Sequence, residues 1–301
     1  MMNVTSQSLQ SLQSLMIAAV VGMLSGTHTA IWGMYKDAIH EGFAVRRFVR
    51  SILVGGAVAV AIQLALGLPL PGAAAIIVLF GLAYAAERGI VEIWKTFVRE
   101  EDQSKYTIPM QFSVHGVPVR SRGARLAAGA VYVAIVALCL FAVTRLELGP
   151  LGIPTPVRSA LIGLTVGAII AFGGAWKDAP TEGFDPLKFF RSPCLTVVFA
   201  LLLSQLTDSY LQVAVGAIGY ERATAETYKT FFFPSKPRGK FAGKPVLFPE
   251  MLRRRRYFVP AYAAIWAVVI VAGVVALRDL PSRAGVQLDV LPPRSHTVAR
   301  P

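Results

Sequence analysis

The chain has 301 residues, of which 54% are hydrophobic and only 16% are charged, and its mean hydropathy is +0.56. A soluble domain carries roughly 25% charged residues, so this composition excludes an ordinary soluble globular protein. The formal net charge of +13 does not indicate nucleic-acid binding, because the basic residues lie in short segments between long uncharged runs. That distribution is the orientation bias of membrane proteins.

The uncharged runs predict an all-α polytopic membrane protein, since about 20 apolar residues cross the hydrocarbon core as a helix. A polar segment at 1–14 lacks the Lys and Arg of a secretory signal, so we expect the first apolar segment to be retained. Eight spans are predicted in chain order, at 15–34, 51–68, 72–87, 126–144, 156–176, 193–207, 209–220 and 258–277. The middle pair in each half is short, so it either crosses the membrane or forms a re-entrant hairpin. Residues 279–301, rich in Pro and Arg, predict a disordered extracytoplasmic tail.

The strongest pattern in the chain is an internal duplication. Residues 33–51 align without gaps on 174–192, and ten of the nineteen positions are identical. Residues 87–97 align on 221–231 in a second block that follows in the same order. The duplication predicts two membrane repeats, 15–145 and 156–278, of about four helices each.

Charge distribution predicts the orientation. Most basic residues, 24 of 30, lie in the four segments 35–50, 87–125, 177–192 and 221–257. With eight spans these segments share one side, which the positive-inside rule makes the cytoplasmic side of the inner membrane, and both termini lie outside. An even number of spans in each repeat predicts parallel repeats related by a pseudo-twofold axis along the membrane normal.

The first duplicated block supplies one set of candidate ligand-binding residues. Its members are Lys36, Asp37, Glu41 and Arg50, with their equivalents Lys177, Asp178, Glu182 and Arg191. Asp37 and Glu41 are four residues apart and share a helix face, and Gly42 is expected to end that helix. Snorkelling of long basic side chains to the membrane interface explains why cations occur here. It does not explain why two carboxylates are present in both copies. A structural ion-pair network and a ligand site both remain open.

The second block supplies another set of candidates. These residues are Glu87, Arg88, Glu92 and Lys95, with their equivalents Glu221, Arg222, Glu226 and Lys229. Arg88, Glu92 and Lys95 lie on one helical face. The set is either a self-paired interfacial helix or a cationic cluster that holds an anionic group such as a phosphate.

Two further features lie in the first span of each copy. Gly22 and Gly26, aligned with Gly163 and Gly167, allow close approach of helices, and we expect these spans to pack near the pseudo-axis, against each other. His28 is an intramembrane polar candidate without an equivalent in the second copy. It is either a functional group or a histidine bonded to a neighbouring carbonyl.

Three functions fit these residues. The leading hypothesis is a carrier of an anionic solute or lipid phosphate, in which charged pairs from both repeats converge between the halves. The alternatives are an enzyme acting on a phosphorylated lipid, with Asp37, Glu41 and Glu87 around a divalent metal, and a non-catalytic scaffold. No metal-binding spacing occurs, Cys139 and Cys194 are interpreted as packing residues, and the cofactor and oligomeric state stay unknown. The basic stretch 236–244 and the arginines at 253–256 predict contact with anionic lipid headgroups.

Overall fold

The backbone forms long antiparallel helices with one small hairpin. The computed structural model describes residues 4–147, 152–232 and 240–280, and the tail predicted at 279–301 lies almost wholly outside them. The α-helices are α1 (Val4–Glu41), α2 (Val45–Leu66), α3 (Ala73–Ile93), α4 (Arg122–Glu147), α5 (Thr155–Glu182), α6 (Pro186–Leu203), α7 (Tyr210–Thr227), α8 (Met251–Arg254) and α9 (Val259–Arg278). The other elements are the π-helical turns η1 (Trp94–Val98) and η2 (Tyr228–Phe232), the 3-10 turn η3 (Arg255–Phe258), and the antiparallel strands β1 (Ser113–Val114) and β2 (Val117–Pro118).

Seven of the described helices are long and apolar enough to cross a membrane, so the chain is a multi-pass integral membrane protein. They are α1, α2, α3 with η1, α4, α5, α6, and α8 to α9. Of the eight predicted spans, the seventh, 209–220, is not among them. A helix does form there, but α7 extends to Thr227 and includes the charged residues Glu221, Arg222 and Glu226.

Glycines end two of the long helices, and the first of them, Gly42, lies where the sequence predicted a break. α1 continues through Lys36 and Asp37 to Glu41, and Gly42 then takes a φ of +71°. Gly183 ends α5 in the same way, with a φ of +80°. Left-handed backbone favours glycine because it has no Cβ. The first set of candidate carboxylates therefore lies on the last turns of two membrane helices. At the other end of α1, residues 4–14 belong to the same helix.

Small residues allow α1 to lie directly on α2, and α5 on α6. Gly22 faces the carbonyl of Gly55, and Gly26 faces the carbonyl of Ser51. Gly163 and Gly167 meet Thr196 and Pro193 of α6 in the same manner. The expectation that these glycines bring α1 and α5 together was wrong. Each pair of glycines instead packs against the next helix in the chain, because a short turn places that helix alongside.

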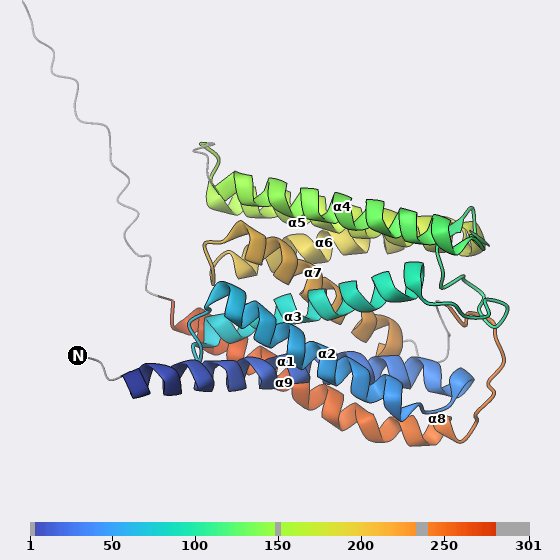
Figure 1. Ribbon diagram of the computed structural model, residues 1–301, viewed down its shortest axis with the longest axis horizontal. Helices are drawn as coiled ribbons and strands as arrows, with labels where there is room; N and C mark the ends of the chain where they lie inside the picture. The colour runs from blue at the N-terminus through green and yellow to red at the C-terminus, as the bar shows by residue number, and fades with distance from the viewer. Residues whose placement is uncertain (1–3, 148–151, 233–239, 281–301) are drawn as a thin grey trace, which may run out of the picture.

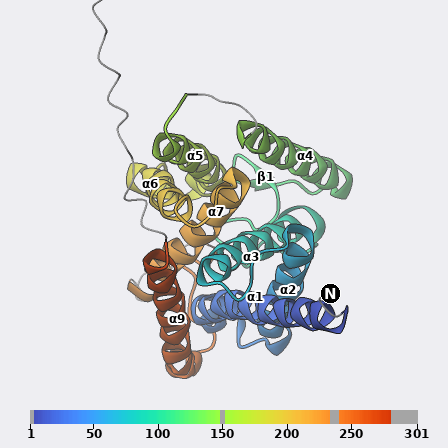
Figure 2. The same ribbon diagram turned by 90° about the vertical axis from the view of Figure 1, so that its left-hand side faces the viewer.

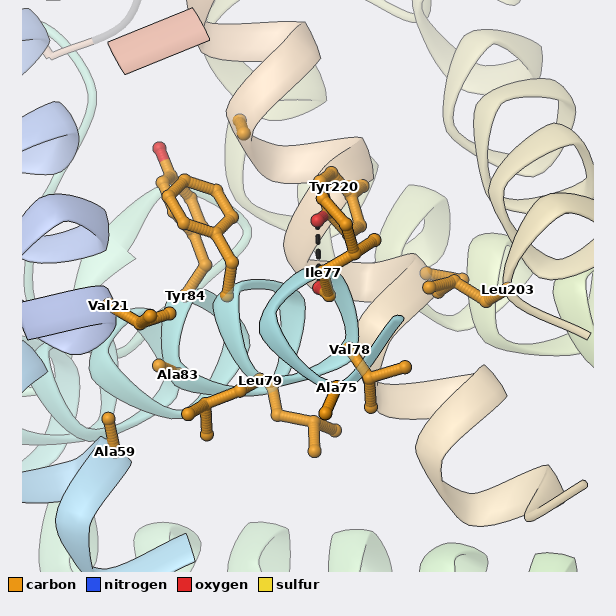
Figure 3. Close-up of a cluster of buried hydrophobic side chains, with 14 of the residues drawn as sticks. Val21, Ala59, Ala75, Ile77, Val78, Leu79, Ala83, Tyr84, Leu203 and Tyr220 are labelled. Carbon is orange, nitrogen blue, oxygen red and sulfur yellow. Dashed lines mark hydrogen bonds between the residues drawn. The ribbon is translucent and has the colours of Figure 1, made fainter. Parts of the chain in front are cut away.

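The centre of the protein is instead the contact between α3 and α7. Gly219 packs on the backbone of Gly81, and Tyr220 lies across it. The Tyr220 hydroxyl donates a hydrogen bond of 2.8 Å to the carbonyl of Ile77 (Figure 3). Leu79 and Tyr84 of α3 are fully buried nearby. Close backbone approach and one buried hydrogen bond thus join the two halves.

The outer helices cross between the halves (Figure 2). α9, late in the chain, packs against α1 and α3, whereas α4 packs against η1 and α7. Val143 of α4 contacts the cluster formed by Ile162, Val166 and Ala214. The last helix of each predicted repeat therefore covers helices of the other one.

Charge-rich segments gather at one end of the bundle. Residues 35–50, 99–121, 177–192 and 240–258 all lie at the right-hand end in Figure 1, and we call this the charged end. The turns at 67–72 and 204–209 lie at the opposite end (Figure 1).

Glycine packing in α1 leads to a testable difference between two positions. A Cβ at Gly22 would press on the Gly55 carbonyl and on Ala59, whereas a Cβ at Gly33 would meet open space. We expect Gly22→Ala to lower the free energy of unfolding by about 1–3 kcal/mol, the usual cost of overpacking. Gly33→Ala should be neutral or slightly stabilising, because alanine favours helix. Denaturant titration in detergent micelles measures both, and equal effects would contradict this packing.

Candidate anion-binding site

The site begins on the last two turns of α1. Asp37 and Glu41 are one helical turn apart and project from the same face. Trp32 lies one turn earlier, and two cations lie over its ring: Lys36 at 5.9 Å and Arg88 of α3 at 5.4 Å from the centroid. An aromatic face attracts cations, so Trp32 helps to hold both basic groups in place.

The end of α3 brings paired charges to the same place. Glu87 is fully buried and accepts two hydrogen bonds from Arg88, at 2.7 and 3.1 Å. Glu92 accepts from Lys95 at 3.1 Å and lies 3.8 Å from Arg88. The helix then widens into the π-helical turn η1, which starts at Trp94. The sequence predicted that Arg88, Glu92 and Lys95 share one helical face, and Glu92 does form ion pairs with both basic residues.

A cavity of about 120 Å³ opens between these elements at the charged end. Its charged lining consists of two acidic side chains, Asp37 and Glu41, and six basic side chains, Arg47, Arg50, Arg88, Lys95, Arg99 and Lys240. The excess of basic groups makes it an attractive environment for an anion. Five of the predicted residues thus line one cavity: Asp37, Glu41, Arg50, Arg88 and Lys95.

Arg50 differs from the other five basic groups of this lining. Arg47, Arg88, Lys95, Arg99 and Lys240 each pair with a carboxylate. Within the part of the chain that the structure describes, Arg50 has no carboxylate within 4.0 Å, and its buried Nε has no hydrogen-bond partner. Its guanidinium lies 5.7 Å from the centroid of Trp94. Arg50 therefore makes no direct ion pair among the described residues, which makes it a candidate group for binding an anion.

Lys240 reaches the cavity from a distant segment. Its Nζ lies 3.0 Å from Oδ2 of Asp37 and 3.2 Å from Oε1 of Glu41. We call residues 240–248 the strap, because they lie over the end of α1. Thr107 donates to the carbonyls of Lys240 and Ala242 from one side, and the amides of Leu247 and Phe248 donate to the Ile39 carbonyl on the other.

Tyr106 contacts two residues of the cavity lining, Glu41 and Lys240. Its hydroxyl donates to Glu41 at 3.4 Å, and Lys240 lies 5.3 Å from its ring centroid. Burial, followed by the neighbouring Glu101 carboxylate, raises the pKa of Tyr106 to about 12. Tyr106 is therefore a neutral hydrogen-bond donor at physiological pH.

In the second half, the equivalent carboxylates find a different partner. Lys188 pairs with both Asp178, at 2.6 Å, and Glu182, at 2.8 Å. Glu221 is fully buried, accepts from Ser192 at 2.7 Å and lies 3.5 Å from Arg222. The structure does not bring the predicted site residues Asp178, Glu182, Glu221 and Arg222 to the cavity of the first half.

Arg191 repeats the situation of its equivalent, Arg50. It also has no carboxylate within 4.0 Å among the described residues, and its Nε is buried without a hydrogen-bond partner. The same position in both halves thus carries an arginine without a counter-ion.

Charged groups of the two halves do meet in the middle of the charged end. Lys36 of α1 lies 3.7 Å from Glu226 of α7, which also pairs with Lys229 at 3.3 Å. Lys177 of α5 lies 3.7 Å from the sulfur of Met110. The Lys36–Glu226 pair therefore joins α1 of one half to α7 of the other.

His28 lies deeper in the bundle, away from the cavity. It is fully buried, its Nδ1 is 3.2 Å from the Tyr84 hydroxyl, and its ring stacks on Tyr262 at 4.2 Å. Of the two alternatives, a bond to a neighbouring carbonyl was wrong, because a tyrosine hydroxyl of α3 is the partner. The Tyr84 hydroxyl also accepts from Trp32 at 2.9 Å, so His28 belongs to an aromatic network.

Sequence reasoning missed four lining residues: Trp32, Arg47, Arg99 and Lys240. Arg47 aligns with Lys188, and that match was a usable signal. Lys240 was assigned with its neighbours to headgroup contact, and nothing local distinguishes it. No group of three His, Cys, Asp or Glu side chains in the described ranges is close enough to hold a metal ion.

No family model, no curated protein and no solved structure matches the chain.

The ion pair between the halves can be tested by a double-mutant cycle on Lys36→Gln and Glu226→Gln. Both side chains are largely buried, so we expect a coupling of about 0.5–3 kcal/mol in the free energy of unfolding, the range for residues in contact. The control cycle combines Lys36→Gln with Asp208→Asn at the opposite end, where additivity is expected. Additive effects for Lys36 and Glu226 would show that the pair does not stabilise the protein.

Proposed function

We propose that this protein is a membrane carrier of an anionic solute or lipid phosphate, with its binding site in the cavity at the charged end. The observation that carries the proposal is Arg50, a cavity-lining arginine without a counter-ion among the described residues. Leaving a charge unpaired within a membrane protein is costly, and such residues mark ligand pathways. An anion that binds between Arg50, Arg88 and Lys95 would supply the missing negative charge.

The duplication supports carriage rather than binding alone. Two parallel repeats with the charged segments on the cytoplasmic side of the inner membrane would place equivalent arginines, Arg50 and Arg191, in the two halves. The halves meet at the α3–α7 contact and at the Lys36–Glu226 pair. A small rotation about this contact would change the access to each arginine.

The two alternatives have less support. An enzyme with a divalent metal needs Asp37, Glu41 and Glu87 around one ion, but Lys240 neutralises the first two and Arg88 neutralises the third. A pure scaffold predicts reciprocal ion pairs without a cavity. The cavity and the unpaired arginines favour a ligand over both alternatives.

Reconstitution into proteoliposomes tests the carrier. The assays are efflux of inorganic anions and transbilayer movement of fluorescent anionic lipids. We expect the wild type to move one of these classes and Arg50→Gln to reduce the rate about tenfold or more, as loss of one charge-assisted bond predicts. Arg46→Gln is the matched control, because Arg46 is exposed on the same helix and does not line the cavity. A wild-type protein that moves neither class would contradict the proposal.

The proposed orientation can be tested separately by cysteine labelling. In a background of Cys139→Ser and Cys194→Ser, the exposed positions Ser104 and Asp208 report on opposite ends of the bundle. We expect a membrane-impermeant maleimide to label Asp208→Cys in intact cells. Ser104→Cys should react only after the membrane is opened. The reverse pattern would place the charged end outside.

A further inference from the structure

We infer that the anion bound at Arg50 is the phosphate of a membrane lipid, which enters the cavity from the hydrocarbon side along α2. This inference rests on the proposed function and names its substrate class. Three observations support it: how the cavity is covered, which face of α2 carries Arg50, and what surrounds the equivalent arginine.

The cavity is covered toward the water at the end of the bundle. The strap contributes Lys240 to its lining, and the segment between η1 and α4 contributes Arg99 and Met110. The two segments are bound to one another, since Thr107 donates to the Lys240 carbonyl at 2.8 Å and Lys244 donates to the Ser104 carbonyl at 3.1 Å. A soluble anion that arrives from this side meets a layer held by hydrogen bonds.

The rim at the turn between α1 and α2 is open. Phe43 and Arg47 line the cavity there and are exposed. Beyond them α2 presents an apolar stripe at Val45, Val49 and Leu53, spaced one helical turn apart, of which Val45 is 61% and Leu53 is 62% exposed. This stripe faces lipid and leads from the rim into the hydrocarbon. An acyl chain on it would place its headgroup at the rim.

Arg50 lies at the edge of this stripe. Its neighbour Ser51 faces α1 and is buried, whereas Val49 is exposed. A guanidinium at the border between protein and lipid, near the end of a span, is at the depth of lipid phosphates. Arginine also binds phosphate in a bidentate manner.

The second half repeats the same surroundings. Arg191 is flanked on α6 by Leu187, which is 85% exposed, and by Phe190, which is 60% exposed. Both arginines without counter-ions thus adjoin lipid-facing apolar side chains, so the lipid surface is the feature that the two positions share.

The size of the cavity agrees with a headgroup. Its volume of about 120 Å³ has room for several water molecules, and so for a small polar headgroup. That space accommodates a phosphate with part of its glycerol and leaves the chains outside. A phosphate monoester carries more negative charge than a diester, so it would form the stronger charge-assisted bonds with Arg50.

The test measures the melting temperature of the full chain in phosphatidylcholine nanodiscs, with and without phosphatidic acid. Inorganic phosphate and glycerol 3-phosphate are the soluble arms, and phosphatidylglycerol at the same fraction controls for surface charge. Phosphatidic acid should raise the melting temperature of the wild type and of Arg46→Gln. In Arg50→Gln the shift should be lost. The soluble phosphates should bind at least about tenfold more weakly, because they bury no acyl chain.

Two other outcomes would contradict the inference, one for the lipid substrate and one for the cavity as its site. If the soluble phosphates stabilise the wild type as well as phosphatidic acid and Arg50→Gln abolishes both effects, the substrate is a free anion, and the carrier proposal survives. If phosphatidic acid and phosphatidylglycerol act equally on wild type and Arg50→Gln, the effect is surface charge, and the cavity is not the site. Arg50→Lys, which keeps the charge but not the bidentate geometry, provides a folded variant with weakened binding should Arg50→Gln be unstable.

Discussion

The cost of an unpaired charge inside a membrane protein constrains the rest of this structure. An ionised side chain in the hydrocarbon region costs several kcal/mol unless a partner compensates it. The buried carboxylates Glu87, Glu221 and Glu226 each have a basic partner within 4.0 Å. These pairs allow α3 and α7, which carry the charges, to occupy the centre of the bundle and not its surface.

Pairing also explains how α7 can lie among apolar helices although its composition does not qualify it as a span. Its charged residues lie in its last two turns, at the charged end, where Lys36 and Lys229 neutralise Glu226. Nearer its middle, Gly216 and Gly219 permit close packing on Leu203 and Gly81. The paired charges at one end of α7 and the glycines in its middle together allow this helix to lie at the centre of the bundle.

Equivalent acidic residues in the two halves have different ion-pair partners. Asp37 and Glu41 pair with the distant Lys240, while their equivalents Asp178 and Glu182 pair with Lys188 from the adjacent helix. The aromatic network around His28 has no counterpart around α5, since an isoleucine, Ile169, takes the equivalent place there. An arginine without a carboxylate within 4.0 Å among the described residues occurs at the same position in both halves, and this recurrence favours a ligand role over a purely structural one.

The amino-acid sequence by itself determined the features that depend on local physics. Long uncharged runs specify membrane helices, Gly42 and Gly183 end two of them, and the duplicated blocks identify Asp37, Glu41, Arg50, Arg88 and Lys95, which line one cavity. Only the tertiary structure decided that α7 lies inside, that α4 and α9 cover the opposite halves, and that Tyr84 is the partner of His28. It also decided that Lys240 reaches Asp37 across about two hundred residues of chain. Hydropathy and spacing report on one helix at a time, whereas these contacts join segments far apart in the chain, and their pairing is selected by packing and by charge neutralisation.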